Sequence, residues 1–232
     1  MTVPSPAQDT PAARLIAITG IDGAGKSTLA ARLHHDLNAA GHTAILVGKH
    51  TTDVPDDPDL SAYIYAVNAA VYRRSADVAR LCGDRYWLLA LAAWYSLQDK
   101  LVIQPALNDG VTVILDNTHH KILARYAVNP DIPAGLPEQV FAHLTEPDMV
   151  LFLRISGTEA LRRKGEFTSL ETGHAGSADA DFIAYQDLVL DQLNALADRD
   201  RWHSLDVADM DRAKVLAEAG GAVHDRLGLN LA

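Results

Sequence analysis

Residues 15–28, with the sequence LIAITGIDGAGKST, decide the fold of this chain. An apolar run (15–19) leads into the glycine-rich stretch GIDGAGKS (20–27), and a segment of helical character follows (29–37). A strand before the pattern G-x-x-x-x-G-K-S and a helix after it are the context that a phosphate-binding loop requires. The alternative is a glycine-rich turn that contains GKS by chance, and the flanking strand and helix disfavour it. We therefore predict a nucleoside triphosphate site at this loop.

The residue types of this loop suit an anion. Glycines let backbone N–H groups curl around a phosphate without Cβ clashes, and the new helix points its positive end at the same anion. Lys26 is placed for the β- and γ-phosphates, and Ser27 for a Mg²⁺ ion. The predicted cofactor-binding residues are Gly20, Asp22, Gly23, Ala24, Gly25, Lys26, Ser27 and Thr28.

Composition limits the class of protein. The chain has 232 residues, of which 48% are hydrophobic and 22% charged, a balance typical of one globular domain with a substantial core. Its formal net charge of −10 argues against nucleic acid as the main partner. The single cysteine, Cys82, excludes an intrachain disulfide and is expected to be buried. Residues 1–13 predict a flexible tail, no segment is long enough to span a membrane, and we expect a cytoplasmic protein.

Strands and helices alternate along the rest of the chain. Apolar runs predict further strands, and helical periodicity lies between them. This alternation is typical of an α/β fold with a parallel sheet of about five strands and helices on both faces, in a single domain over residues 14–228. The further strands are expected at 43–48, 111–115, 149–155 and about 202–207, and the main helices at 60–74, 84–107, 158–164, 181–197 and 210–227.

Several segments together resemble one family. The loop spelling GIDGAGKST with its internal Asp22, the segment IQPAL (103–107) before a strand that ends at Asp116, and Glu146-Pro147-Asp148 before MVLFLRI are similar to the thymidylate kinase family of P-loop nucleoside monophosphate kinases. The resemblance covers about residues 14–228. It implies a three-layer P-loop fold, ATP- and Mg²⁺-dependent transfer of the γ-phosphoryl group to dTMP or a related nucleotide, a mobile lid over about 158–180, and a homodimer.

The family supplies an additional catalytic cation from an arginine in the loop or from the lid. This loop has Gly23 at that position, so the resemblance assigns the cation to the lid, at Arg162 or Arg163. A solvated helix face is the alternative for these bases. Asp116 ends a buried strand, where α/β folds place ligands, and could hold Mg²⁺ or orient the attacking oxygen. A plain helix N-cap is the alternative for Asp116.

The chain departs from the family where the acceptor is bound. The family has an arginine directly after the aspartate, and this chain has Asn117. The position of a second arginine falls on Tyr95 or Trp94, and Lys49 begins a changed loop after the second strand. Neither asparagine nor tyrosine offers the charged fork that suits phosphate. The predicted substrate-binding residues are Asp22, Lys49, Arg85, Tyr95 and Asn117.

These departures leave the acceptor open. Lys121 and Arg125 follow Asp116 at helical spacing and could reach inward as replacement cations. The adjacent His119 and His120 lack the spacing of metal ligands. A kinase is favoured over an ATPase or switch. Within the kinase class, the acceptor is dTMP or a related nucleotide, and the alternative is a divergent kinase of a modified nucleotide, a nucleoside or a specialised metabolite. The loss of phosphate-binding charge favours this divergent kinase over a true dTMP kinase.

Overall fold

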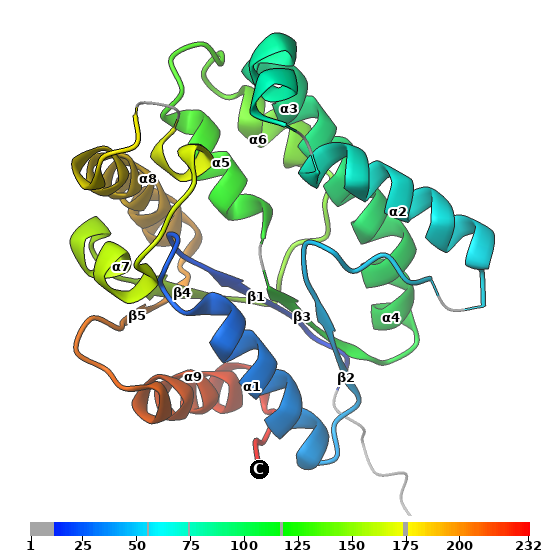
Figure 1. The fold of residues 1–232 in the computed structure, drawn as a ribbon. Coiled ribbons are helices and arrows are strands. Elements are labelled where there is room, and N and C mark those ends of the chain that lie inside the picture. The colour runs from blue at the N-terminus through cyan, green and yellow to red at the C-terminus, as the bar shows by residue number, and fades with distance from the viewer. Residues whose placement is uncertain (1–11, 55, 74, 117, 174–175) are drawn as a thin grey trace, which may run out of the picture.

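The computed structural model describes residues 12–54, 56–73, 75–116, 118–173 and 176–232 (Figure 1). In this part of the chain the strands form one sheet of five parallel strands in the order β2-β3-β1-β4-β5. This arrangement confirms the predicted α/β fold and the expected number of strands. The strands are β1 (Leu15–Thr19), β2 (Ala44–Val47), β3 (Thr112–Asp116), β4 (Met149–Arg154) and β5 (His203–Asp206).

Strand β1 lies in the centre of the sheet and places the glycine-rich loop. Every residue of β1 is buried, as expected for a strand covered on both faces. Ile18 pairs with Asp116 of β3 on one side and with Leu151 of β4 on the other. Because parallel strands bring their carboxyl ends to one edge, the loop after β1 and the acidic end of β3 lie next to each other.

Helices cover both faces of the sheet. Figure 1 shows α1 and α9 together on one face, while α3 and α5 lie on the opposite side. The α-helices are α1 (Lys26–Ala39), α2 (Pro58–Tyr72), α3 (Ala76–Gln98), α4 (Gln104–Asn108), α5 (His119–Ala127), α6 (Leu136–Phe141), α7 (Gly157–Lys164), α8 (Asp179–Asp200) and α9 (Arg212–Leu227). A π-helical segment, η1 (Asp99–Ile103), joins α3 to α4, and a 3₁₀ turn, η2 (Ser169–Thr172), precedes α8.

The long helix predicted at 84–107 is a composite of three segments. Its predicted start is marked by Gly83, whose φ of 74° breaks the helical geometry inside α3. Helical residues precede this break, and Cys82 is exposed there, so the expectation of a buried cysteine was wrong. The reason is that this first part of α3 extends past the core, whereas Trp87, Trp94 and Tyr95 after the break are buried.

The segment expected to be a lid contains α7 and η2. Its mobility stays a prediction, and residues 174–175 within it are outside the described residues. Most of the predicted tail, residues 1–11, is also outside them. Among the described helices, none is both long and apolar enough to cross a membrane.

Candidate active site

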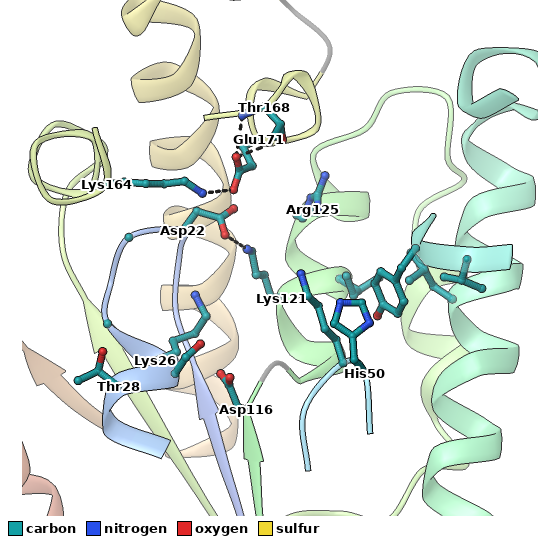
Figure 2. Close-up of a pocket in the computed structure, with 18 residues that line it drawn as sticks. Asp22, Lys26, Thr28, His50, Asp116, Lys121, Arg125, Lys164, Thr168 and Glu171 are labelled. Carbon is teal, nitrogen blue, oxygen red and sulfur yellow. Dashed lines mark hydrogen bonds and ion pairs between the residues drawn. The ribbon is translucent and has the colours of Figure 1, made fainter. Parts of the chain in front are cut away.

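A cavity of about 650 Å³ lies at the carboxyl ends of β1 and β3 (Figure 2). One side is formed by the glycine-rich loop and the start of α1, and the other by the turn after β2, the end of α2 and the middle of α3. Helix α5 and the residues around α7 and η2 complete the wall. The predicted phosphate-binding loop therefore borders a cavity large enough to hold a small-molecule ligand.

The loop has the backbone geometry that its glycines allow. Gly23 and Gly25 have φ values of 85° and 95°, in the left-handed region that favours glycine. A Cβ on Gly23 would lie 2.6 Å from the backbone oxygen of Ala160 in α7. The loop therefore packs directly against the helix that opens the predicted lid. Gly20 and Ala24 are buried and support the loop from beneath.

Lys26 starts α1 and faces the cavity. Its Nζ donates a hydrogen bond to the backbone oxygen of Ile21, at 2.7 Å, across the loop. Burial lowers the pKa of Lys26 to about 7, and the neighbouring Lys121 adds to this effect, while Asp22 and Asp116 oppose it. An anion bound in the loop would restore the charged form of this amine.

Asp22 is paired with a cation from a distant part of the chain. Lys121, in α5, donates a hydrogen bond from its Nζ to Oδ1 of Asp22. Burial alone would raise the pKa of Asp22, but Lys121 and Lys26 outweigh it and hold the pKa well below its usual value. The backbone N–H of Asp22 donates to Oε1 of Gln186 in α8, at 3.1 Å. The acidic residue of the loop is thus fixed by both α5 and α8.

Ser27 and Asp116, the two predicted metal ligands, both line the cavity, and their role as ligands stays a prediction. Their side-chain oxygens are the kind of ligand that Mg²⁺ prefers, with phosphate oxygens and water completing its shell. The N-cap of α5 is Thr118, so the alternative that Asp116 caps a helix is wrong. No group of three or more His, Cys, Asp or Glu side chains suited to a metal occurs in the part of the chain that the structure describes.

The turn after β2 is anchored to α2 and carries Lys49 to the cavity. The side chain of Asn68 donates to the backbone oxygen of Lys49 at 2.6 Å, and its Oδ1 is 3.1 Å from Nδ1 of His50. Nζ of Lys49 lies 6.0 Å from the ring centroid of Tyr72. Val71, Leu91 and Ile122 add an apolar surface on this side. The wall therefore combines a cation with a surface on which a flat ring can pack.

The predicted catalytic arginines do not line the cavity. Arg162 and Arg163 both donate to Glu159 at 2.7 Å, and Arg163 also donates to the backbone oxygen of Val207 at 2.6 Å. The base that reaches the cavity is the next one, Lys164, which pairs with Glu171 of η2. Successive helical side chains point in different directions, so only one of these bases can face the site.

Two predicted substrate-binding residues also lie away from the cavity wall. Arg85 is exposed on α3, and Tyr95 is buried with its ring against Phe141. Neither is among the residues that line the cavity, so the structure does not bring them to the acceptor side. Asn117 lies outside the described residues.

Sequence reasoning missed how α8 and η2 hold the site together. Nε2 of Gln186 donates to the backbone oxygen of Glu171 at 2.8 Å, so one buried amide joins the loop to η2. Thr168, which lines the cavity, donates from its backbone N–H to Glu171 at 2.8 Å. A glutamine within a predicted amphipathic helix carries no signal of this role.

Comparison with known proteins identifies the family. The family model described as "Thymidylate kinase" matches residues 18–209. The chain belongs to the thymidylate kinase family.

Relatives in this family come from distant organisms. A thymidylate kinase of Xanthomonas oryzae is 35% identical over 67% of this chain and 63% of its own length. The thymidylate kinase of Chlorobaculum parvum is 29% identical over 67% of this chain and 68% of its own length. The human enzyme is 28% identical over 64% of each chain. The chain thus spans less than two thirds of the Xanthomonas relative, and what the complete relatives do is a proposal for this protein.

Proposed function

We propose that this member of the thymidylate kinase family transfers the γ-phosphoryl group of ATP to a nucleoside monophosphate, dTMP or a closely related nucleotide, with Mg²⁺. The observation that supports the proposal is the cavity lined by Lys26 and Ser27 of the loop and by Asp116 at the end of β3. Figure 2 shows Lys26 and Asp116 at the same end of the sheet. The volume of the cavity, about 650 Å³, is in the range of small-molecule sites. Family membership supports the class of reaction.

The charged and polar residues of the cavity would have different roles in the transfer. The backbone N–H groups of the loop and the ammonium of Lys26 would hold the β- and γ-phosphates. Ser27 and Asp116 would hold Mg²⁺, which neutralises charge on the phosphates when it is bound. Lys164 is the lid base that could stabilise the charge on the equatorial oxygens of the group in transfer. The lid above it would exclude water and so favour transfer over hydrolysis.

The other end of the cavity suits the acceptor. The ring of Tyr72 with Val71, Leu91 and Ile122 offers an apolar surface for a base. Lys49, Lys121 and Arg125 surround it with cations, which favours a charged nucleotide over a neutral nucleoside. The divergent-kinase alternative rests on Asn117, where the family has an arginine. No feature of the described residues specifically supports an ATPase or a switch.

An ADP-release assay with ATP and Mg²⁺ tests the proposal. The acceptors are dTMP, dUMP, other monophosphates and thymidine, and one reaction contains no acceptor. We expect turnover that depends on a nucleoside monophosphate and that Asp116→Asn reduces by about 100-fold or more. Release with thymidine alone would support the nucleoside kinase, and release that no acceptor increases would support an ATPase. Lys214→Met, at an exposed position of α9, is the control variant.

The homodimer implied by the family also stays a proposal. Large apolar side chains are exposed on helices α2 and α3: Tyr63 and Tyr65 on α2, and Val78, Leu81 and Leu89 on α3. Large exposed apolar side chains are found at protein contacts, and their presence on α2 and α3 supports association through these helices.

A further inference from the structure

Gln186 is a buried amide in the first half of α8, between the phosphate-binding loop and η2. The residues that share its face of the helix include Phe182 and Val189, which are buried and apolar. Gln186 is only 1% exposed, and a buried amide costs free energy unless its polar atoms are hydrogen-bonded. Both atoms have partners, since Oε1 accepts the backbone N–H of Asp22 at 3.1 Å and Nε2 donates to the backbone oxygen of Glu171 at 2.8 Å. One side chain therefore connects two segments that are far apart in the sequence.

Both partners of Gln186 are backbone groups of fixed polarity. An N–H group can only donate and a carbonyl oxygen can only accept, so the amide has one allowed orientation. An ionised glutamate at this position would keep the bond to Asp22 but would have no hydrogen to donate to Glu171. A methionine would lose both bonds. The position thus needs an acceptor and a donor at the end of one side chain.

The two backbone groups belong to residues whose side chains hold cations of the cavity. Oδ1 of Asp22 accepts a hydrogen bond from Lys121, and Glu171 pairs with Lys164 (Figure 2). Glu171 also accepts the backbone N–H of Thr168 at 2.8 Å. These residues all line the cavity, whereas the buried amide of α8 does not. Any effect of this amide on a ligand must therefore act through them.

Helix α8 holds the lid segment on both sides of Lys164. Oδ1 of Asp187, the residue after Gln186, accepts the backbone N–H of Gly157 at 2.6 Å, in the first turn of α7. A Cβ on Gly157 would lie 2.7 Å from a backbone oxygen of α8, so the two helices pack closely there. Glu171, seven residues after Lys164, is tied to α8 through Gln186. Loss of this amide would release the far side of the segment while its beginning stays anchored.

We propose that Gln186 is a positioning residue for the phosphoryl transfer, because it sets the lid base Lys164 relative to the phosphate-binding loop. The inference rests on the proposed function. Without the amide, Asp22 is still held by Lys121, so the loop should keep its affinity for the triphosphate. Glu171 loses its bond to α8, so Lys164 is no longer fixed over the group in transfer. The loss should therefore appear in kcat and in the exclusion of water, and not in nucleotide affinity.

Kinetics of Gln186→Met in the full chain test the proposal. ADP release is measured with ATP and Mg²⁺, with and without dTMP or dUMP, whichever of the two the wild-type protein uses faster. The kcat with the monophosphate should fall by about 10- to 100-fold, because the lid base and the group in transfer are no longer aligned. The share of ADP that is released without an acceptor should rise. Calorimetry with a non-hydrolysable ATP analogue should show a change in affinity of less than about threefold.

Gln186→Glu gives a result that a loss of packing cannot imitate, because a carboxyl group has the shape of the amide. When protonated, it can donate to Glu171 and accept from Asp22 as the amide does. When ionised, it repels the backbone oxygen of Glu171 and the carboxylate of Asp22, whose Oδ2 lies 3.5 Å from Nε2 of Gln186. Burial raises the pKa of such a carboxyl group. The kcat of this variant relative to wild type should therefore increase as the pH falls from 8 to 6, and Gln186→Met should show no such recovery.

A matched control separates this role from a general effect on the helix. Gln192 is a partly exposed glutamine of α8, and Gln192→Met should leave kcat unchanged. The Tm of each variant is measured at each pH, so that every assay is run on folded protein.

The outcomes distinguish the two proposals. A kcat of Gln186→Met equal to that of Gln192→Met would overturn the inference and leave the kinase function standing. Parallel losses of kcat and of affinity for the ATP analogue, with an unchanged share of acceptor-free release, would also overturn it, because Gln186 would then only support the loop. So would a Gln186→Glu profile that runs parallel to wild type from pH 8 to pH 6. Wild-type ADP release that no monophosphate increases would overturn the proposed function, and the inference with it.

Discussion

The pKa of Lys26 predicts that nucleotide affinity falls as the pH rises above neutral. Burial lowers this pKa to about 7 in the ligand-free protein, so the amine is mostly neutral at pH 8. A triphosphate in the loop favours the ammonium form, so binding must add a proton. Below pH 7 the amine of Lys26 already carries this proton, so it does not weaken binding. Above pH 7 the free-energy cost of protonating the amine increases with pH, so the affinity for the nucleotide falls.

The pKa of Lys26 also sets the size of the expected change in affinity. Each pH unit above a pKa of about 7 costs about 1.4 kcal/mol, or about tenfold in affinity. The affinity for an ATP analogue should therefore fall by about tenfold between pH 8 and pH 9. Close to one proton should be taken up for each nucleotide bound. The terminal phosphate is fully ionised over this range, so its own titration does not contribute.

Calorimetry in two buffers of different ionisation enthalpy measures both quantities. Lys26→Arg is the matched variant, because arginine stays charged at pH 9 and its complex should show neither the pH slope nor the proton uptake. Burial also lowers the pKa of Lys121, which this variant leaves in place. A constant affinity between pH 8 and pH 9 would refute the reasoning. So would proton uptake that persists in Lys26→Arg, since another group would then be responsible.

Three other predictions concern the lid, the loop and the core. Lys164→Met should lower kcat by about tenfold or more in the ADP-release assay, and clearly more than Arg162→Met does, because Lys164 lines the cavity and Arg162 does not. Equal effects of the two substitutions would contradict this prediction. Gly110→Ala should lower the free energy of unfolding by about 1 kcal/mol, because alanine is strained at the φ of 80° found there. Gly23→Ala should lower it by more, because its Cβ would also lie 2.6 Å from the backbone oxygen of Ala160. Urea denaturation measures both free energies. Trp94→Phe should lower the free energy of unfolding by about 1 kcal/mol less than Trp87→Phe does. The reason is that Nε1 of Trp87 donates a hydrogen bond to the backbone oxygen of Ala79 at 2.8 Å, whereas Nε1 of Trp94 has no hydrogen-bond partner among the described residues. The reverse order of these two costs would show that packing volume decides the outcome.

Features that depend on neighbouring residues could be predicted from the sequence. The loop at 20–27 follows from glycine and lysine spacing between an apolar run and a helix, and the strand that ends at Asp116 follows from a run of β-branched residues. The break at Gly83 also agrees with the predicted start of the long helix at residue 84. These features are local, because backbone conformation and apolar periodicity are set within a few residues.

The partners of the charged side chains were decided only by the tertiary structure. Arg85 carries the same charge as Arg125, but it lies on an exposed part of α3, while α5 packs against α8 and turns Arg125 to the cavity. Lys121 meets Asp22 across 99 residues of sequence, a contact that no local pattern encodes. Likewise, the rotation of α7 places Lys164 at the cavity and directs Arg162 to Glu159. The sequence by itself determined a phosphate-binding loop in a parallel sheet, and the packing of α5, α7 and α8 decided which cations face the ligand.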